Sequence, residues 1–387
     1  MGIAEKIRQI WIAKIAIRNA IRAKGVTVAD SEPMSGYASK ISQIQSGGGS
    51  GDPIHRISYA VSSGQVSAIQ RIELPPVARI ADRVFSGVSC IEYAFAEGIQ
   101  EIGLSSFGNN GRLLELNLPN SINLIGQDAF IANTGLTSLR IGFGTNPAPL
   151  VLSSGSFMNC RFIKTIEIGG RIKRLPYQTF SGNDRLESIT VPPELTHVDQ
   201  YCFNNCYQLR QFSSEYVVEA GSYAFSGCTN LHTVYLPNCT TIQARLFDRC
   251  TNLANVTLSD NIQNLRSDLF VNCNVIKSII FPRNAEVALQ RLVYSCAEVR
   301  YVEFGDKLNT ITSYPLILGA PKLRAVVFRN PTPPTIATPV YSQFDQVDKT
   351  QLKVYVPDES LDAYKARFAT DQALFYPMSQ FVMPSLT

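Results

Sequence analysis

The sequence is poor in several residue types, and these shortages exclude whole classes of protein. It has 1 Trp and only 3 His, and His55, His197 and His232 are far apart. None of the 9 cysteines forms a C-x-x-C pair, so the spacing typical of zinc sites is absent. No apolar run approaches the roughly 18 residues of a membrane-spanning helix. We therefore expect neither a metal centre nor a membrane span.

Charge is also scarce, and its pattern excludes another kind of partner. Charged residues make up 17% of the chain, the net charge is +4, and no run of Lys and Arg is interleaved with aromatic residues. Domains that bind nucleic acids concentrate positive charge on one surface, so no nucleic-acid partner is expected. The mean hydropathy of +0.02 indicates a well-buried globular chain and not a disordered one.

Enzyme motifs are missing as well. No glycine-rich phosphate loop and no G-x-S-x-G elbow precedes a helical pattern. We expect a protein that is not an enzyme and needs no cofactor. The catalytic alternative is a carboxylate pair assembled from different parts of the chain, such as Glu167 with Glu187.

What the sequence does contain is a unit of about 23 residues, repeated from near residue 63 to near residue 328. Each unit starts at a large apolar residue, here called its anchor. Six residues later comes Ile, Leu or Val, and two alternating apolar positions follow, as in Leu231, Val234 and Leu236. The anchors are Phe85, Phe107, Phe130, Phe157, Phe180, Phe203, Phe225, Phe247, Phe270, Val293 and Ile317.

This pattern predicts an array of short strands. Strict alternation over four residues is typical of a strand with one buried side, and a Pro or Gly such as Pro237 ends it. One unit cannot bury its own apolar side, whereas stacked units bury a continuous core. A degenerate first unit is indicated by Ile69, Ile72 and Leu74, and one insertion falls near residues 144–149. The predicted architecture is a solenoid of parallel strands.

Most cysteines share one place in this repeat. Three residues after an anchor stands Cys160, Cys206, Cys228, Cys250, Cys273 or Cys296, and other units have Asn110, Asn133 or Asn183 there. Equivalent places in consecutive units stack, so we expect a buried ladder in which the thiol acts as a small hydrophobe and Asn bonds to turn backbone. Cys202 does not fit this place.

The first 45 residues follow another pattern. Isoleucines recur with spacings of 4, 3, 7 and 4 residues, at Ile3, Ile7, Ile10, Ile17 and Ile21. These are heptad core positions, and Ile at both core positions favours three or four strands, so a trimer is predicted. A second short helix and a Gly/Ser stretch follow. We therefore divide the chain into a helical oligomerisation or attachment module (1–45), a linker (46–53), the solenoid (54–330) and a C-terminal cap (331–387). The alternative is a helical hairpin that caps the solenoid.

The repeat resembles the leucine-rich repeats of BspA-like bacterial surface proteins. Their pattern AF-x-x-C-x-x-L-x-x-I-x-L-P is matched best by residues 224–237. Residues 333–336, 352–357 and 361–365 resemble the "PPT", "YVP" and "AYK" segments that commonly end such arrays. The resemblance implies an α+β leucine-rich-repeat solenoid of short parallel strands, here preceded by the helical hairpin or coiled coil.

Residues 17–44 resemble a segment that recurs in structural proteins of tailed phages, with "I-x-x-A-I-x-x-K-G" followed by "YA-x-x-I". Basic residues are spread through the first helix, so no signal peptide is expected. Together these features favour a virion fibre or decoration protein that is made in the host cytoplasm. Its N-terminal helices would attach to another virion protein, and its repeats would recognise a host-surface glycan or protein. The alternatives are a bacterial cell-surface adhesin and a structural decoration protein without a ligand.

The binding residues are expected on the outer side of the strands, eight and ten places after each anchor. Hydroxyls, amides and scattered aromatic rings there suit a glycan, and a basic column beside them would favour acidic sugars. The opposing interpretation is a merely solvated strand surface. The predicted patch consists of Tyr235, Asn255, Lys277, Arg300, Tyr301 and Arg324.

Overall fold

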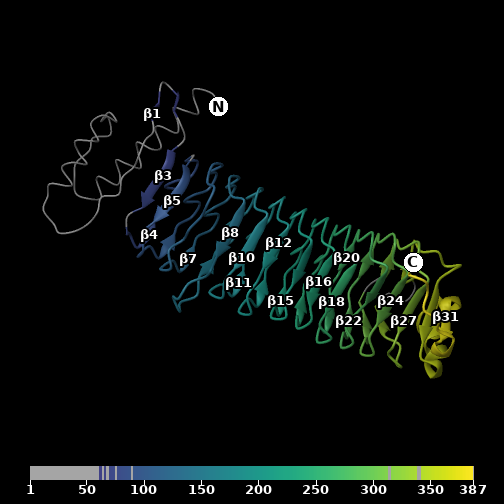
Figure 1. Ribbon diagram of the computed structural model, residues 1–387. Helices are drawn as coiled ribbons and strands as arrows, with labels where there is room; N and C mark the ends of the chain where they lie inside the picture. The colour runs from purple at the N-terminus through teal and green to yellow at the C-terminus, as the bar shows by residue number, and fades with distance from the viewer. Residues whose placement is uncertain are drawn as a thin grey trace.

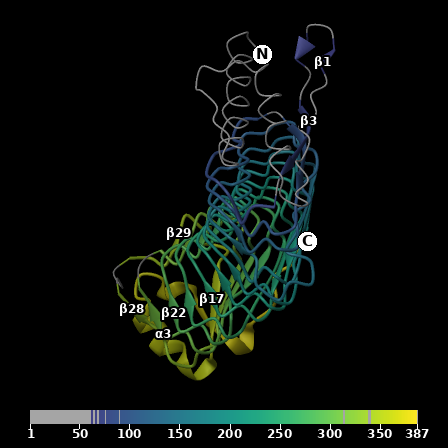
Figure 2. The same ribbon diagram turned by 90° about the vertical axis from the view of Figure 1, so that its left-hand side faces the viewer.

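The computed structural model describes residues 61–62, 65–66, 69–74, 76–88, 90–312, 315–337 and 341–386. In these residues the chain winds into a long solenoid whose coils lie side by side along one axis (Figure 1). Seen along that axis, the coils lie one behind another (Figure 2). The predicted N-terminal module with its isoleucines, and the linker after it, lie outside the described residues, so the trimer stays a prediction.

Every described coil except that of Phe107 contributes a strand to the first side of the solenoid, at the alternating positions found in the sequence. Within four runs of this column neighbouring strands pair in parallel, as Val234 does with Val256. The final strand of the column does not belong to a coil. It follows the last coil and pairs in parallel with the strand before it. This column contains β3 (Ile69–Leu74), β5 (Cys90–Phe95), β8 (Ser138–Ile141), β10 (Thr165–Ile168), β12 (Ser188–Thr190), β14 (Gln211–Ser213), β16 (Thr233–Leu236), β18 (Asn255–Leu258), β21 (Ser278–Ile280), β24 (Tyr301–Phe304), β27 (Ala325–Phe328), β30 (Lys353–Val356) and β31 (Phe375–Pro377). Among these described strands no pairing joins β5 to β8, β12 to β14, or β18 to β21.

A second column of two-residue strands forms another side of the solenoid. It contains β4 (Arg79–Ile80), β6 (Glu101–Ile102), β7 (Leu124–Ile125), β9 (Val151–Leu152), β11 (Arg174–Leu175), β13 (His197–Val198), β15 (Glu219–Ala220), β17 (Thr241–Ile242), β19 (Asn264–Leu265), β22 (Val287–Ala288), β25 (Thr310–Ile311) and β28 (Thr335–Ile336). An antiparallel pair, β1 (Val61–Ser62) and β2 (Gln65–Val66), precedes both columns.

The anchors form the third side, and their backbone is a turn. In the coil of Phe130, Asp128 and Ala132 on either side of the anchor have φ values of 53° and 55°. The amides of Asp128, Phe130 and Ala132 all donate to carbonyls of the next coil, at 2.8 to 3.0 Å. This arrangement replaces any helix in the described coils, so the predicted α+β repeat is wrong in its helical part. The last coils tighten here into β20 (Phe270–Val271), β23 (Val293–Tyr294), β26 (Ile317–Leu318) and β29 (Phe344–Asp345).

The core is a ladder of anchor rings along the axis. Phe107, Phe130 and Phe157 are fully buried, and consecutive rings stack with centroids 5.2 and 5.3 Å apart. Rings that overlap with this spacing bury apolar area and gain dispersion contacts on both faces. The solenoid is therefore held together by one continuous core in place of separate domain cores.

The cysteine column lies beside the rings, as predicted. The thiol of Cys228 donates to the carbonyl of Phe203 in the preceding coil at 3.1 Å. The amide of Asn133 makes the equivalent bond to Phe107 at 3.0 Å. Cys and Asn can exchange at this place because both can supply a second donor to an anchor carbonyl, which in Phe203 already accepts the backbone amide of Cys206 at 3.1 Å. Asn183 differs, since neither polar atom of its side chain is bonded among the described residues. Burial raises the pKa of the Cys228 thiol to about 12. Cys202, which the pattern did not explain, stands one residue before its anchor, in the column of Thr179.

The insertion near residues 144–149 is held by Arg171. This side chain is 8% exposed and reaches back across the preceding coils. Its guanidinium donates to the carbonyls of Ala148, Asn120 and Ile122 at 3.0, 3.0 and 2.6 Å. Desolvation lowers the pKa of Arg171. A buried cation thus adds bonds to two preceding coils at the place where the repeat length changes.

The columns continue past residue 330, the predicted end of the array, because β28, β29 and β30 pair with the strands before them. The cap then adds α3 (Leu361–Arg367), three 3-10 helices at Asp358–Ser360, Gln372–Leu374 and Met378–Gln380, and β31. In the described residues α3 is the one α-helix. Tyr364 on it is buried and donates to the carbonyl of Asn330 at 2.7 Å.

The cap also closes the anchor side. The backbone amide of Gln343 points out of the last coil and donates to a carboxylate oxygen of Asp371 at 2.9 Å. Asp371 is 3% exposed, and its carboxylate also forms an ion pair with Lys349 at 2.9 Å. Alternate backbone amides on this side, such as those of Phe130 and Ala132, point toward the C-terminal end. A negative charge is therefore favourable where the series stops, as it is at the N-terminus of a helix.

Between the coils of Phe247 and Phe270 both strand columns are interrupted. No backbone pairing joins β17 to β19, or β18 to β21. The anchor side continues, with the amide of Arg249 donating to Val271 at 2.8 Å. An ionic cluster also spans this boundary. Asp268, with a side chain 5% exposed, lies 3.1 Å from Arg245 in one coil and 2.8 Å from Arg291 in another.

Candidate binding surface

The outer side of the first strand column contains a long surface without charge. The strands position its side chains in register, so that Ser213, Tyr235 and Thr257 are neighbours on β14, β16 and β18. Ion pairs bound this surface, Arg140 with Glu167 at one end and Arg329 with Glu303 at the other. We call it the uncharged strip, and its members are Ser188, Thr190, Gln211, Ser213, Thr233, Tyr235, Asn255, Thr257, Ser278 and Ile280.

The polar groups of the uncharged strip are free. None of its side chains has a hydrogen-bond or ion-pair partner within the described residues, although ion pairs and side-chain bonds are common on either side of it. Two large, largely apolar side chains are exposed among these polar residues. Ile280 is 65% exposed and Tyr235 is 38% exposed. A surface of unpaired hydroxyls and amides with isolated apolar groups can satisfy a partner that is itself rich in hydroxyls.

The structure brings together only part of the predicted patch. Tyr235 and Asn255 lie on the uncharged strip, on neighbouring strands, and Lys277 is exposed beside it. Lys277 has no ion-pair partner in the described part of the chain. Ile280 belongs to the same surface and was not selected from the sequence. Its signal was an isoleucine at an outward place that polar residues occupy in most other units.

Tyr301 is a correction. It points outward as predicted, but it is 1% exposed because the C-terminal residues cover it. Tyr301, Ala325, Val327 and Tyr355 form a second apolar cluster with Tyr376, Met378, Phe381 and Leu386. The hydroxyl of Tyr301 donates to Glu303. Burial, together with this bond, raises the pKa of Tyr301. Its side chain cannot contact a ligand while the cluster is intact.

The basic column is also interrupted. Arg300 is half-buried and donates to the carbonyl of Ser385 at 3.4 Å, while Arg324 donates to the carbonyl of Leu323 at 3.1 Å. Arg210 pairs with Glu187 at 3.1 Å. These contacts leave no continuous row of free cations, so the structure gives little support for the expected affinity for acidic sugars on this surface.

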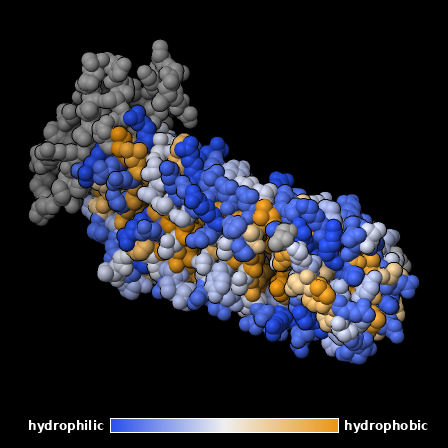
Figure 3. Space-filling view, turned by 45° about the vertical axis from the view of Figure 1, so that its right-hand side comes forward, coloured by the Kyte–Doolittle hydropathy of each residue, from blue (hydrophilic) through white to orange (hydrophobic). Residues whose placement is uncertain are grey.

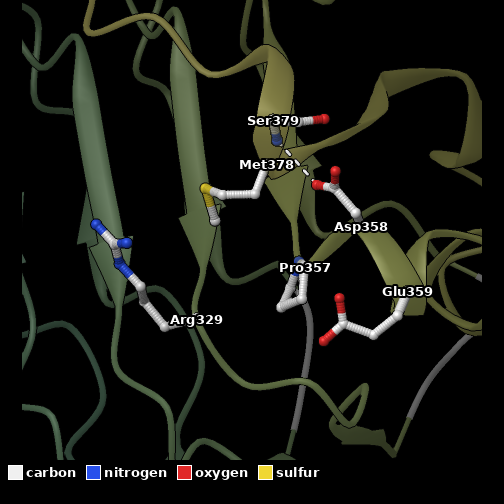
Figure 4. Close-up of a pocket in the computed structure, with 6 residues that line it drawn as sticks. All are labelled: Arg329, Pro357, Asp358, Glu359, Met378 and Ser379. Atoms are coloured by element: carbon white, nitrogen blue, oxygen red, sulfur yellow. Dashed lines mark hydrogen bonds between the residues drawn. The ribbon is translucent and has the colours of Figure 1, made fainter.

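An open groove of about 570 Å³ lies at the C-terminal end, beside the cap. In Figure 4 the carboxylate of Asp358 turns toward the backbone of Ser379, whose amide donates to it at 2.8 Å, while Arg329 points away from both. Hydrogen bonds from Ser379 lower the pKa of Asp358. Because Arg329 pairs with Glu303 and Asp358 is used by the cap, the groove presents few free polar groups.

The described side chains and helices meet the requirements of neither a metal site nor a membrane span. They contain no group of three or more His, Cys, Asp or Glu side chains that could hold a metal ion. No helix among them is long and apolar enough to cross a membrane. The surface in Figure 3 mixes polar residues with small apolar groups along its length. Glu167 pairs with Arg140, and Glu187 pairs with Arg210, so the suggested carboxylate pair is divided between two ion pairs.

The sequence matches the family profile described as BspA type Leucine rich repeat region, in 6 copies that span residues 62–146, 151–275 and 213–318. The chain belongs to this family. Its members are cell-surface proteins of bacteria, and solenoids of this type typically serve as binding scaffolds without catalytic activity. A search of curated proteins by sequence gives no match.

Several solved structures are similar to the BspA-type chain. A leucine-rich repeat protein from Bacteroides ovatus is 18% identical and matches 80% of this chain and 84% of its own, with a TM-score of 0.45. A leucine rich cell surface protein from Faecalibacterium prausnitzii is 18% identical over 72% of this chain and 96% of its own, with a TM-score of 0.38. The pneumococcal vaccine antigen PcpA is 15% identical over 83% and 81%, with a TM-score of 0.37.

Proposed function

We propose that this protein is a non-enzymatic recognition protein of a bacterial cell surface, and that it binds a neutral, hydroxyl-rich partner through the uncharged strip. The observation that carries the proposal is the set of unpaired polar side chains on that strip, which extends over five neighbouring strands from β12 to β21. The class of partner that fits is a glycan of a host or neighbouring cell.

The chemistry follows from the side chains. Hydroxyls and amides can both donate and accept, so Asn255 and Thr257 can pair with sugar hydroxyls in either direction. The ring of Tyr235 and the side chain of Ile280 can cover the apolar C–H side of a sugar. A flat face without a deep pocket suits a partner with several similar units, because each unit adds a weak contact.

The proposal is tested by the binding of the full chain to an array of neutral and acidic glycans. Tyr235→Ala should weaken binding to the neutral glycans by roughly five- to tenfold, as expected for loss of a sugar-covering aromatic side chain of about 1 kcal/mol or slightly more. The matched control is Tyr207→Ala, since Tyr207 is 41% exposed but lies off the strip. Equal binding by wild type and Tyr235→Ala would contradict the role of the uncharged strip, and absence of binding by the wild type would favour the ligand-free structural role.

The virion-fibre prediction depends on residues 1–45 and stays a prediction, as do the trimer and the partner at the N-terminus. Light scattering of the full chain and of a chain that starts at Asp52 tests it. A multimeric full chain with a monomeric truncation supports an assembly module of the kind a fibre needs. A monomer in both cases removes the physical basis for the fibre.

A further inference from the structure

A polar cleft opens at one of the two interruptions of the second strand column. It lies between β17 and β19, has a volume of about 400 Å³, and is lined by Thr240, Thr241, Ile242, Asn261, Gln263, Asn264 and Arg266. Cavities that hold small ligands start at roughly 300 Å³. The cleft lies on another column of the solenoid than the uncharged strip, and it does not depend on the function proposed for that strip.

Backbone amides point into this cleft. The residue four places before an anchor normally donates its amide to the preceding coil, as Gln243 does to Ala220 at 3.0 Å and Leu289 does to Leu265 at 2.9 Å. Pro176 has no amide hydrogen, which accounts for the gap between β9 and β11. Arg266 does have one, yet among the described residues it has no acceptor. The amide of Gln263 is free in the same way, so two donors face β17 across the cleft.

The side chains of the cleft are also unpaired. The Nε atom of Arg266 is buried and has no hydrogen-bond partner, and no carboxylate in the described chain pairs with this residue. The side-chain amides of Asn261, Gln263 and Asn264 are exposed and have no partners there either. A buried guanidinium nitrogen without a partner is costly, because its desolvation is not compensated. Most other coils have Gly, Ser or another small residue at the place of Arg266.

We propose that this cleft binds a sugar acid, with its carboxylate on Arg266 and the amides of Gln263 and Arg266, and its hydroxyls on the side-chain amides of Asn261 and Asn264. Arg266 is the one charged residue that lines the cleft, so an anion is the complementary ligand. An inorganic anion would use the guanidinium and backbone amides but leave the side-chain amides without partners. A uronic acid supplies both kinds of group and is small enough for the space.

The first test is calorimetric titration of the full chain with glucuronate, glucose and acetate. Glucuronate should bind with saturation and more tightly than either glucose or acetate. Arg266→Gln should weaken its binding by roughly tenfold or more, because a charge-assisted pair is lost. The matched control is Lys173→Gln, which removes an exposed cation from the same column at the gap between β9 and β11 and should leave the affinity unchanged.

A second variant keeps the charge. Asn264→Trp places a large ring at the exposed mouth of the cleft and should also abolish glucuronate binding, while thermal unfolding shows that each variant is folded. Equal affinity for glucuronate and acetate would overturn the sugar-acid assignment. Absence of saturable binding to the wild type, or unchanged binding by Arg266→Gln, would overturn the site itself. Wild-type binding of Arg266→Gln to the neutral glycans of the array separates this site from the uncharged strip.

Discussion

The ring of Phe381 packs against the ring of Tyr301, with 5.9 Å between their centroids. Phe381 also meets Tyr355 edge-on at 5.0 Å, so one side chain of the C-terminal segment bridges two strands of the first column. Between these tyrosines β27 presents the small outward residues Ala325 and Val327. The outer face of the solenoid is therefore divided into the open uncharged strip and an apolar end that the chain covers itself.

Phe381→Ala should expose this apolar end. Loss of the ring removes contacts with two tyrosines, and we expect the free energy of unfolding to fall by about 2 kcal/mol, below the value for a fully buried Phe because Phe381 is half-buried. Urea denaturation measures the change, and limited proteolysis should cut after residue 377 faster than in wild type. Val382→Ala is the control, since Val382 is 75% exposed. Equal proteolysis of both variants would contradict the role of Phe381 in holding the C-terminal segment against the strands.

Asp268→Asn should weaken the boundary between the coils of Phe247 and Phe270. The change leaves Arg245 and Arg291 facing each other without a negative charge, and a broken buried ion pair costs several kcal/mol. We expect a loss of about 2 to 3 kcal/mol in chemical denaturation, since both arginines are partly exposed. Glu187→Gln breaks an exposed pair with Arg210 and should cost less than about 1 kcal/mol. Similar losses in the two variants would show that the cluster has no special role at this boundary.

Cys228→Ala should destabilise the ladder without unfolding it. The substitution removes one of the two donors to the carbonyl of Phe203, leaving the backbone amide of Cys206, and it opens a small cavity, for an expected cost of about 1 to 2 kcal/mol. The measurement is urea denaturation under reducing conditions. Ser213→Ala on the uncharged strip should stay within about 0.5 kcal/mol of wild type. A Cys228→Ala protein as stable as wild type would mean that the thiol bond contributes nothing.

Stability should also fall at alkaline pH because of the thiols. Burial raises the pKa of Cys160 and of Cys228 to about 12 in the folded protein, whereas an unfolded thiol has a pKa of about 8.5. Below pH 8.5 both states keep the proton, and the contribution is fully present. Between that value and pH 12 only the unfolded state loses its proton, so each thiol lowers stability by about 1.4 kcal/mol per pH unit.

Urea denaturation in reductant at pH 8 and pH 10 measures this slope. The Cys228→Ala protein should lose less stability than wild type between the two pH values. The difference should equal the loss of unfolding free energy that one buried thiol causes over this pH range. The same slope in both proteins would show that Cys228 is not buried as a neutral thiol.

The repeat made much of the fold predictable. Anchors, strand positions and the cysteine column follow from one short pattern, because every coil places the same position in the same surroundings. The place of Arg171 at the insertion and the turn conformation around each anchor were not predictable in this way. The position of Arg171 depends on carbonyls some 50 residues away. The turn conformation around each anchor depends on hydrogen bonds between coils, which stabilise a turn where a helix was predicted.

The sequence by itself determined which side of each strand is buried, since a period of two residues fixes the direction of Tyr235 and Tyr301 alike. Only the tertiary structure decided that Tyr235 is exposed and Tyr301 is covered, because the covering residue, Phe381, comes 80 positions later in the chain. The missing backbone pairing between β17 and β19, beside Arg266, was likewise decided only by the tertiary structure. Pairing between coils is set by how closely whole coils approach, which local periodicity does not encode.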